Sequence, residues 1–121
     1  MNKSKQEQEK RTMLRRIRHT SLSGNKMNHF TFYNSEQDAH IKKKWEVFFK
    51  LRRAGYDCWT EVIFNSGIRM DILAYKEGFW SNYEILSSET SKELAKKVKN
   101  YPDVEVISVD IDQDLEDLEM F

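Results

Sequence analysis

Hydrophobic positions divide residues 35 to 110 into a helical pattern, three strand patterns, a second helical pattern and a last strand pattern. The first helix is expected to begin at Ser35, which with Asp38 has the form of an N-terminal capping box. It is expected to run to about Ala54, where Gly55 stops it. A broad apolar stripe should pack this helix on a sheet, and its members are Ile41, Trp45, Phe48, Phe49 and Leu51.

Polar positions on the same helix fall into two groups. Glu46 lies opposite the apolar stripe, which predicts an ordinary solvent-facing ion pair with Lys42 or Lys50. His40 and Lys44 instead border the stripe, so they are expected to face a site at the end of the sheet.

Three strand patterns follow at 56–64, 68–76 and 79–86, rich in β-branched and aromatic residues and separated by short turns that contain glycine. Short connections make these strands antiparallel neighbours. Alternation in the second strand predicts one face with Ile68, Met70, Ile72 and Ala74, and another with Arg69, Asp71, Leu73 and Tyr75. Asp71 is then an acid at the centre of a mostly apolar strand.

A second helix is predicted at about 91–100, capped by Thr90 or Ser91 and ending before Pro102. Val104 to Val109 then alternates between apolar and polar residues as a fourth strand. Because a helix separates it from the third strand, the fourth can run parallel to it through a right-handed crossover. The order predicts an α/β fold with one mixed four-stranded sheet flanked by helices.

Composition places the chain among small soluble proteins. Its 121 residues, 39% of them hydrophobic, suit one domain and contain no apolar run long enough to cross a bilayer, which requires about 20 residues. The N-terminus lacks the apolar segment of a secretory signal, so we expect an intracellular, cytoplasmic protein with no membrane partner. With Cys58 alone and three histidines, any metal should be held by oxygen ligands.

Charge is segregated along the chain. Residues 1–30 carry eight Lys or Arg and two acids, whereas residues 103–121 carry eight acids and no base. A basic arm suits a phosphate backbone, because neutralising phosphates releases counterions. The alternative is a solvated extension, which could fold back on the acidic tail.

These patterns divide the chain into a basic arm at 1–34, a central domain at 35–110 and an acidic tail at 111–121. Part of the arm, residues 5–18, has the pattern of a short helix whose apolar contacts are Met13, Leu14 and Ile17. The candidate contacts to a DNA backbone are Arg11, Arg15, Arg16 and Arg18.

Three acids, Glu61, Asp71 and Glu84, stand inside the three strand patterns rather than in the turns. A buried carboxylate is costly to ionise unless it is paired or bound to a cation. Mg²⁺, or Mn²⁺, takes oxygen ligands and keeps several waters, so two or three carboxylates on adjoining strands would suffice to hold it. The alternative is that these acids are edge charges that prevent sheets from aggregating.

This order of elements and acids resembles the PD-(D/E)XK nuclease superfamily, with its restriction-endonuclease-like α-β-β-β-α-β core, over the stretch from Ser35 to Asp110. The run from Gly67 to Asp71 is similar to the strand that carries the aspartate of that family, with Met70 where the signature has proline. The segment Tyr83-Glu84-Ile85-Leu86-Ser87 is similar to the second motif, with Leu86 where its lysine should be. Features that resemble one branch of the superfamily are Glu61, Ser87, Glu89, Lys97, and His40 with Lys44.

The missing lysine bears on chemistry, because in that family it orients or activates water and stabilises charge in the transition state. Two lysines are candidates to bring an ammonium to the same point. Lys97 is preferred, since its predicted helix begins just after the strand of Glu84, and Lys44 is the other. The alternative for each is a surface cation whose stem covers the edge of the core.

The resemblance implies a metal-dependent phosphodiesterase, an endonuclease acting on DNA and expected to work as a homodimer. Asp71 and Glu84 would be the metal ligands, with Glu61 as a third acid and His40, Ser87 and Glu89 as secondary candidates. One alternative is a catalytically inactive nuclease-like module that binds nucleic acid or protein. Another is an interaction protein that uses its acidic tail.

The large aromatic residues are interpreted as core, since stacking on bases would need several of them exposed on one surface. They are Trp45, Phe48, Phe49, Trp59, Phe64 and Trp80.

Overall fold

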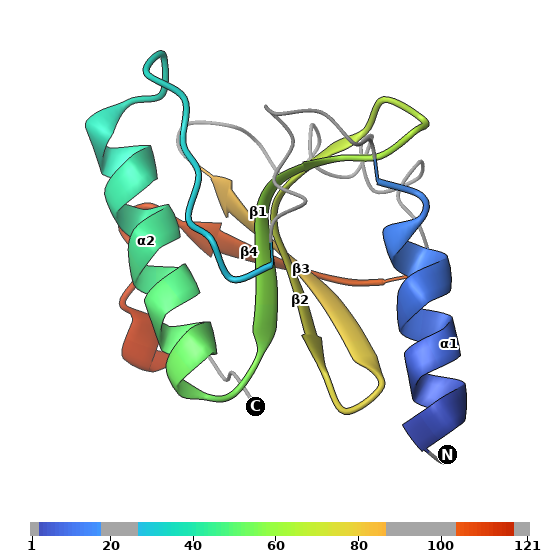
Figure 1. Ribbon diagram of the computed structural model, residues 1–121. Helices are drawn as coiled ribbons and strands as arrows, with labels where there is room; N and C mark the ends of the chain where they lie inside the picture. The colour runs from blue at the N-terminus through green and yellow to red at the C-terminus, as the bar shows by residue number, and fades with distance from the viewer. Residues whose placement is uncertain (1–2, 18–26, 87–103, 118–121) are drawn as a thin grey trace.

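The computed structural model describes residues 3–17, 27–86 and 104–117 (Figure 1). Its elements are α1 (Lys3–Leu14), α2 (Asp38–Arg53), β1 (Asp57–Ile63), β2 (Arg69–Lys76), β3 (Phe79–Leu86), β4 (Glu105–Asp110) and the short 3₁₀ helix η1 (Leu115–Asp117). Within these ranges no helix combines the length and the apolar character needed to cross a membrane.

The four strands form one sheet in the order β1-β2-β3-β4. The first three are antiparallel neighbours and β4 runs parallel to β3, with Glu84 opposite Ser108. The predicted α/β class, meander and mixed four-stranded sheet are therefore confirmed. The second helix, expected at about 91–100, lies outside the described residues.

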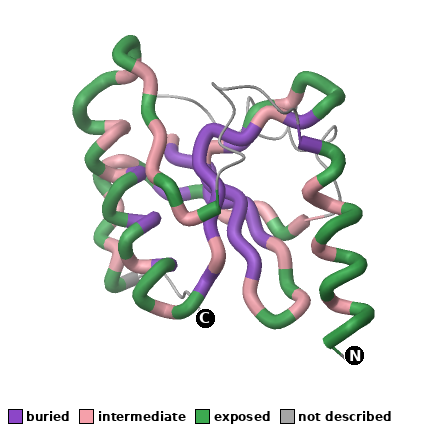
Figure 2. Tube along the Cα trace, viewed as in Figure 1, coloured by how far each residue is buried: buried purple, intermediate pink, exposed green. Residues whose placement is uncertain are grey.

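Helix α2 covers one face of the sheet (Figures 1 and 2). Its buried residues are Lys44, Val47, Phe48 and Leu51, and the apolar ones pack on Cys58, Ile72, Ala74, Tyr83, Ile85 and Val109. The prediction that Trp45 and Phe49 also face the sheet is wrong, because they are 47% and 51% exposed. The hydrophobic pattern does not reveal that a lysine, Lys44, faces the sheet. It does so here because its ammonium pairs with carboxylates.

The start of α2 also differs from the expected capping box. The N-cap is Gln37, which makes no capping hydrogen bond through its side chain. The Glu36 carboxylate accepts a hydrogen bond from the Tyr33 backbone N–H (2.8 Å) and also contacts His40 in the first turn of the helix (2.8 Å). The C-terminal end agrees with the prediction, since Gly55 follows Ala54 with φ 91°, a left-handed value that favours glycine.

Lysines on α2 hold the first part of the acidic tail. Lys43 and Lys50 donate hydrogen bonds to the backbone carbonyls of Gln113 (2.8 Å) and Leu115 (3.0 Å). Glu46 pairs with Lys43 (3.1 Å), one turn back along the helix, rather than with the expected Lys42 or Lys50. The tail as far as η1 is therefore attached to the domain.

Helix α1 covers the opposite face of the sheet, and with Ile17 it closes a second apolar cluster. The predicted contacts Met13, Leu14 and Ile17 pack there on Trp59, Val62, Phe64, Met70, Leu73 and Tyr75. Ile17 is only 1% exposed. A large part of the expected basic arm is thus a helix packed on the sheet.

The alternation of β1 and β2 breaks in the middle of the sheet. Trp59 and Val62 lie in the α1-side cluster although three positions separate them, and so do Met70 and Leu73. A regular strand puts residues an odd number of positions apart on opposite faces. Met70 lies in the α1-side cluster whereas Ile72 packs against α2, so the prediction that they share a face is wrong. On β1 the break lies at Glu61, whose φ of 51° is left-handed and turns that strand over, and on β2 it lies across from Glu61, at Asp71.

Candidate functional site

Glu61, Asp71 and Glu84 form one row across three neighbouring strands. The register of β1 with β2 puts Glu61 across from Asp71, and continuation of the β2–β3 register puts Glu84 on the other side of Asp71. The row coincides with the break in alternation. Backbone strain of the kind seen at Glu61 persists only where surrounding contacts enforce it, and it is common at functional sites.

The carboxylates of Asp71 and Glu84 replace backbone pairing between β2 and β3. The last paired residues of this ladder are Ile72 and Tyr83. Beyond them, the Asp71 N–H donates to Glu84 Oε2 (3.0 Å) and the Ile85 N–H donates to Asp71 Oδ2 (2.8 Å). Each acid is therefore held in place by the backbone of the other's strand.

Lys44 brings an ammonium from α2 to this row. Its Nζ lies 2.6 Å from Glu61 Oε1 and 3.0 Å from both carboxylate oxygens of Glu36, and its side chain is 0% exposed. The alternative that Lys44 is a surface cation is therefore wrong. Lys97, the preferred lysine of the sequence analysis, lies outside the described residues.

His40 lies one turn before Lys44 and links Glu36 to Asp71. Its Nδ1 is 2.8 Å from Glu36 Oε2, and its Nε2 is 3.8 Å from Asp71 Oδ2. The Asp71 carboxylate is the main cause that raises the pKa of His40 to about 9, in opposition to burial. At 3.8 Å this contact is an ion pair rather than a direct hydrogen bond. The raised pKa and the two carboxylate neighbours favour the imidazolium form of His40 at neutral pH.

Glu36 belongs to the site although the sequence pattern did not single it out. Its carboxylate accepts hydrogen bonds from the Tyr33 N–H, from Lys44, and from His40 Nδ1 when that nitrogen carries a proton. Burial opposes its ionisation, but these donors outweigh burial and lower its pKa. The signal that could have revealed it is the four-residue spacing of Glu36, His40 and Lys44, which marks one side of a helix.

The acids differ in how easily they ionise. Burial raises the pKa of Glu61 to about 7, although Lys44 acts in the opposite direction. Burial also disfavours the charged form of Asp71, but His40 and the Ile85 N–H outweigh it and hold the pKa of Asp71 below its usual range. Among the described residues, Lys44 and His40 are the cations that contact Glu36, Glu61 and Asp71.

A divalent metal fits part of this donor set. In the described part of the chain, no group of three or more His, Cys, Asp or Glu residues is arranged to hold a metal ion. Glu61 is engaged by Lys44 at 2.6 Å, which opposes its use as a third ligand. Asp71 and Glu84 lie together where the β2–β3 pairing stops, and two carboxylates suit Mg²⁺, which keeps most of its waters.

Ser87, Glu89 and Arg18 lie outside the described residues. Leu86, at the position of the motif lysine, ends β3 half-buried and opposite Asp110.

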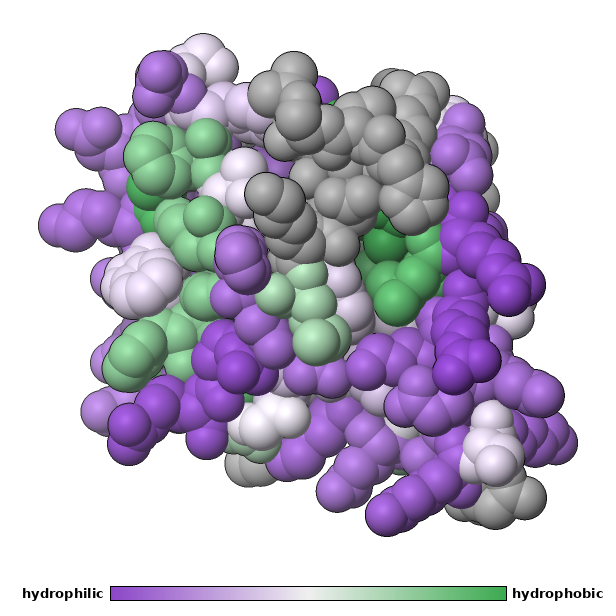
Figure 3. Space-filling model, viewed as in Figure 1, coloured by the Kyte–Doolittle hydropathy of each residue, from purple (hydrophilic) through white to green (hydrophobic). Residues whose placement is uncertain are grey.

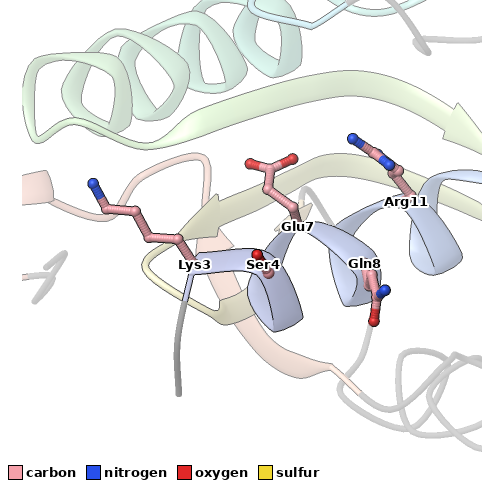
Figure 4. A pocket seen from close by; sticks show the side chains of 5 residues that line it. All are labelled: Lys3, Ser4, Glu7, Gln8 and Arg11. Carbon is pink, nitrogen blue, oxygen red and sulfur yellow. The ribbon is translucent and has the colours of Figure 1, made fainter.

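The described arginines of the arm lie on the α1 side, across the sheet from His40 and Lys44. Arg11, Arg15 and Arg16 are exposed there. Arg11 lines a hollow of about 360 Å³ along α1 with Lys3, Ser4, Glu7 and Gln8. Figure 4 shows Lys3, Glu7 and Arg11 one turn apart along this helix, so the surface has mixed charge.

Comparisons with protein-family models, with curated proteins and with solved structures give no match. The resemblance to the nuclease superfamily therefore rests on the motifs themselves.

Proposed function

We propose that this protein is a metal-dependent phosphodiesterase acting on DNA. The observation that carries the proposal is the row of Glu61, Asp71 and Glu84, with the Lys44 ammonium buried against it. A fold requires neither a left-handed glutamate in a strand nor two carboxylates in place of a backbone ladder. Features that cost the fold stability in this way are typical of functional sites.

Asp71 and Glu84 would hold Mg²⁺ or Mn²⁺, which supplies Lewis-acid stabilisation of charge on a phosphate. His40 keeps Asp71 ionised, as a ligand must be. The family motif has a lysine where this chain has Leu86. Lys44 would provide the missing cation. Glu61, with a pKa of about 7, can accept or release a proton near neutral pH, which suits a general base that activates water.

A second candidate is a nuclease-like module that binds nucleic acid or protein without cleavage. The observation that favours it is again Lys44, whose ammonium is fully buried and already paired with Glu36 and Glu61. A lysine in this condition supports the fold without reaching a substrate. This candidate predicts binding that is insensitive to EDTA and no nicking of any substrate.

The test compares Asp71→Asn and Glu84→Gln with the wild type for cleavage of duplex, single-stranded and branched DNA, in Mg²⁺, Mn²⁺ or EDTA. We expect both variants to lose about two orders of magnitude or more in rate, the scale of removing one essential charge-stabilising group. Asp110→Asn, an exposed acid at the end of β4, is the matched control and should cleave normally. Cleavage by Asp71→Asn at the wild-type rate would refute the proposal, and EDTA-resistant binding without cleavage by the wild type would establish the second candidate.

A further inference from the structure

Several aromatic side chains lie exposed along α2 and the segment before it. Phe32, Trp45 and Phe49 are 48%, 47% and 51% exposed. The ring of Phe30 connects them, with centroids 6.3 Å from Phe32 and 5.2 Å from Trp45, and Trp45 is 5.9 Å from Phe49. We call Phe30, Phe32, Trp45 and Phe49 the aromatic patch, and Figure 3 shows apolar side chains gathered over this part of the surface.

Cations border the aromatic patch on α2. Lys42, Trp45, Phe49 and Arg53 follow one another at helical spacing, so aromatic rings lie between two positive charges. The Arg53 guanidinium is 6.0 Å from the centroid of the Phe49 ring. The exposed cations of α2 are Lys42, Arg52 and Arg53, and its exposed acids are Asp38 and Glu46. Lys43 pairs with Glu46 and Arg52 lies 3.9 Å from Asp57, which leaves Lys42 and Arg53 against Asp38 and makes this side of the helix slightly positive.

The aromatic patch adjoins the acid row. The Phe30 ring centroid is 5.5 Å from Lys44 Nζ, the same ammonium that contacts Glu61. The next residue, Thr31, donates its backbone N–H to Thr60 Oγ1 (2.7 Å), and Thr60 precedes Glu61 on β1. A nucleic-acid strand bound to the aromatic patch would therefore lie next to the acid row of Glu61, Asp71 and Glu84.

The size and charge of the aromatic patch argue against a second copy of this chain as its occupant. Three half-exposed aromatic residues, each of about 200 Å², offer roughly 300 Å², whereas a stable interface buries about 800 Å² per partner. Exposed rings between cations instead suit a single nucleic-acid strand, whose bases can stack on the rings while the cations neutralise its phosphates. Duplex DNA offers no such bases, because they are already stacked on one another.

We propose that the aromatic patch binds unpaired nucleobases by stacking, with Lys42 and Arg53 at the phosphates, so that the substrate is single-stranded or has an unpaired stretch beside the site. This inference rests on the proposed function in taking nucleic acid as the substrate. It adds the class of nucleic acid and the surface that selects it.

The test measures binding in EDTA, where cleavage plays no part, to a thymidine oligonucleotide, to an abasic oligonucleotide of equal length and to a duplex. Trp45→Ala and Phe49→Ala should each weaken thymidine binding by roughly 5- to 100-fold, the effect of losing one stacked base. Trp45→Phe should restore most of it. Phe79→Ala, which removes a 79% exposed ring at the start of β3, is the matched control and should bind as the wild type does.

The abasic strand keeps every phosphate and has no base to stack. We therefore expect it to bind weakly to the wild type and to be insensitive to Trp45→Ala. Equal wild-type affinity for thymidine and abasic strands would overturn the inference. So would a loss of self-association on Trp45→Ala with unchanged DNA binding, which would assign the aromatic patch to a second copy of this chain.

The two proposals fail separately. Binding that depends on Trp45, in a protein that cleaves no substrate, would support the aromatic patch and refute the phosphodiesterase. Duplex cleavage that needs Asp71 and is unchanged in the Trp45→Ala, Phe49→Ala double variant would refute the aromatic patch alone.

Discussion

Lys44 Nζ lies 2.6 Å from Glu61 Oε1, and the two side chains are 0% and 3% exposed. This pair joins the inward side of α2 to the left-handed residue of β1. Taking two charges out of water is costly, and the ion pair offsets that cost only while both partners remain. The same contact fixes the rotation of α2 and the orientation of Glu61, so fold and site depend on it together.

Removing only the lysine should therefore destabilise the protein strongly. We expect Lys44→Met to reduce the free energy of unfolding by about 3 kcal/mol above pH 7, because it leaves the buried Glu61 without its cation and leaves Glu36 with His40 alone. The double variant Lys44→Met, Glu61→Gln should recover a large part of that loss. Urea unfolding of the wild type, both single variants and the double variant gives the coupling energy. Additive losses would contradict the buried pair.

Stability should fall as pH rises, in two windows. The folded-state pKa of His40 is about 9 against an ordinary 6.5, so its contribution is complete below pH 6.5 and is lost as pH rises through 9. Glu61 acts with the same sign in the lower window, because its pKa of about 7 lets the folded state bind more protons than the unfolded state above pH 4.5.

The loss of stability in the upper pH range comes from His40, so a mutation of His40 should remove this pH dependence. We expect His40→Gln to cost about 1 to 2 kcal/mol near pH 6 and little above pH 9, after allowance for the partial exposure of the ring. Urea unfolding at several pH values measures this difference. His29→Gln, at an exposed histidine, is the control. A constant loss at every pH would mean that His40 contributes only by packing.

The turn between β2 and β3 contains a residue poorly suited to its conformation. Glu77 and Gly78 have φ of 48° and 90°, the two left-handed positions of a tight hairpin turn that prefers Asn-Gly. Glu77→Asn should raise the free energy of unfolding by about 0.5 kcal/mol, because asparagine adopts this conformation more easily. The midpoint of urea unfolding provides the measurement, and Glu77→Ala is the control. If alanine stabilises as much as asparagine, the explanation by turn geometry is wrong.

The N-terminal segment, which comprises α1 and the residues up to Ile17, should contribute to stability as well as to charge. Ile17 is 1% exposed and packs in the α1-side cluster, so Ile17→Ala should cost about 2 to 4 kcal/mol in urea unfolding. Arg16→Ala, at the exposed neighbour, should stay within about 0.5 kcal/mol of the wild type. Equal small effects would mean that the segment is not docked. DNA contacts by the arm are therefore better tested by charge reversal at Arg11 and Arg15 than by deletion.

Sequence patterns predicted most of the described fold because they reflect local physics. Alternation of β-branched and aromatic residues located all four strands, and Gly55 located the end of α2. The face assignment failed at Met70, because alternation on β2 is interrupted at Asp71, across from the left-handed Glu61 of β1. Glu36 was missed as a site residue because it precedes the helix and gains its role only through Lys44 and His40.

By itself, the sequence determined the order of the four strands, the mixed sheet they form and the presence of Glu61, Asp71 and Glu84 within them, since periodicity and short turns encode these features. Only the tertiary structure decided that Lys44 lies inside with the acids while Trp45 lies outside. The rotation of a helix about its axis depends on partners distant in sequence. Here the partner that holds Lys44 inward is Glu61, 17 residues away.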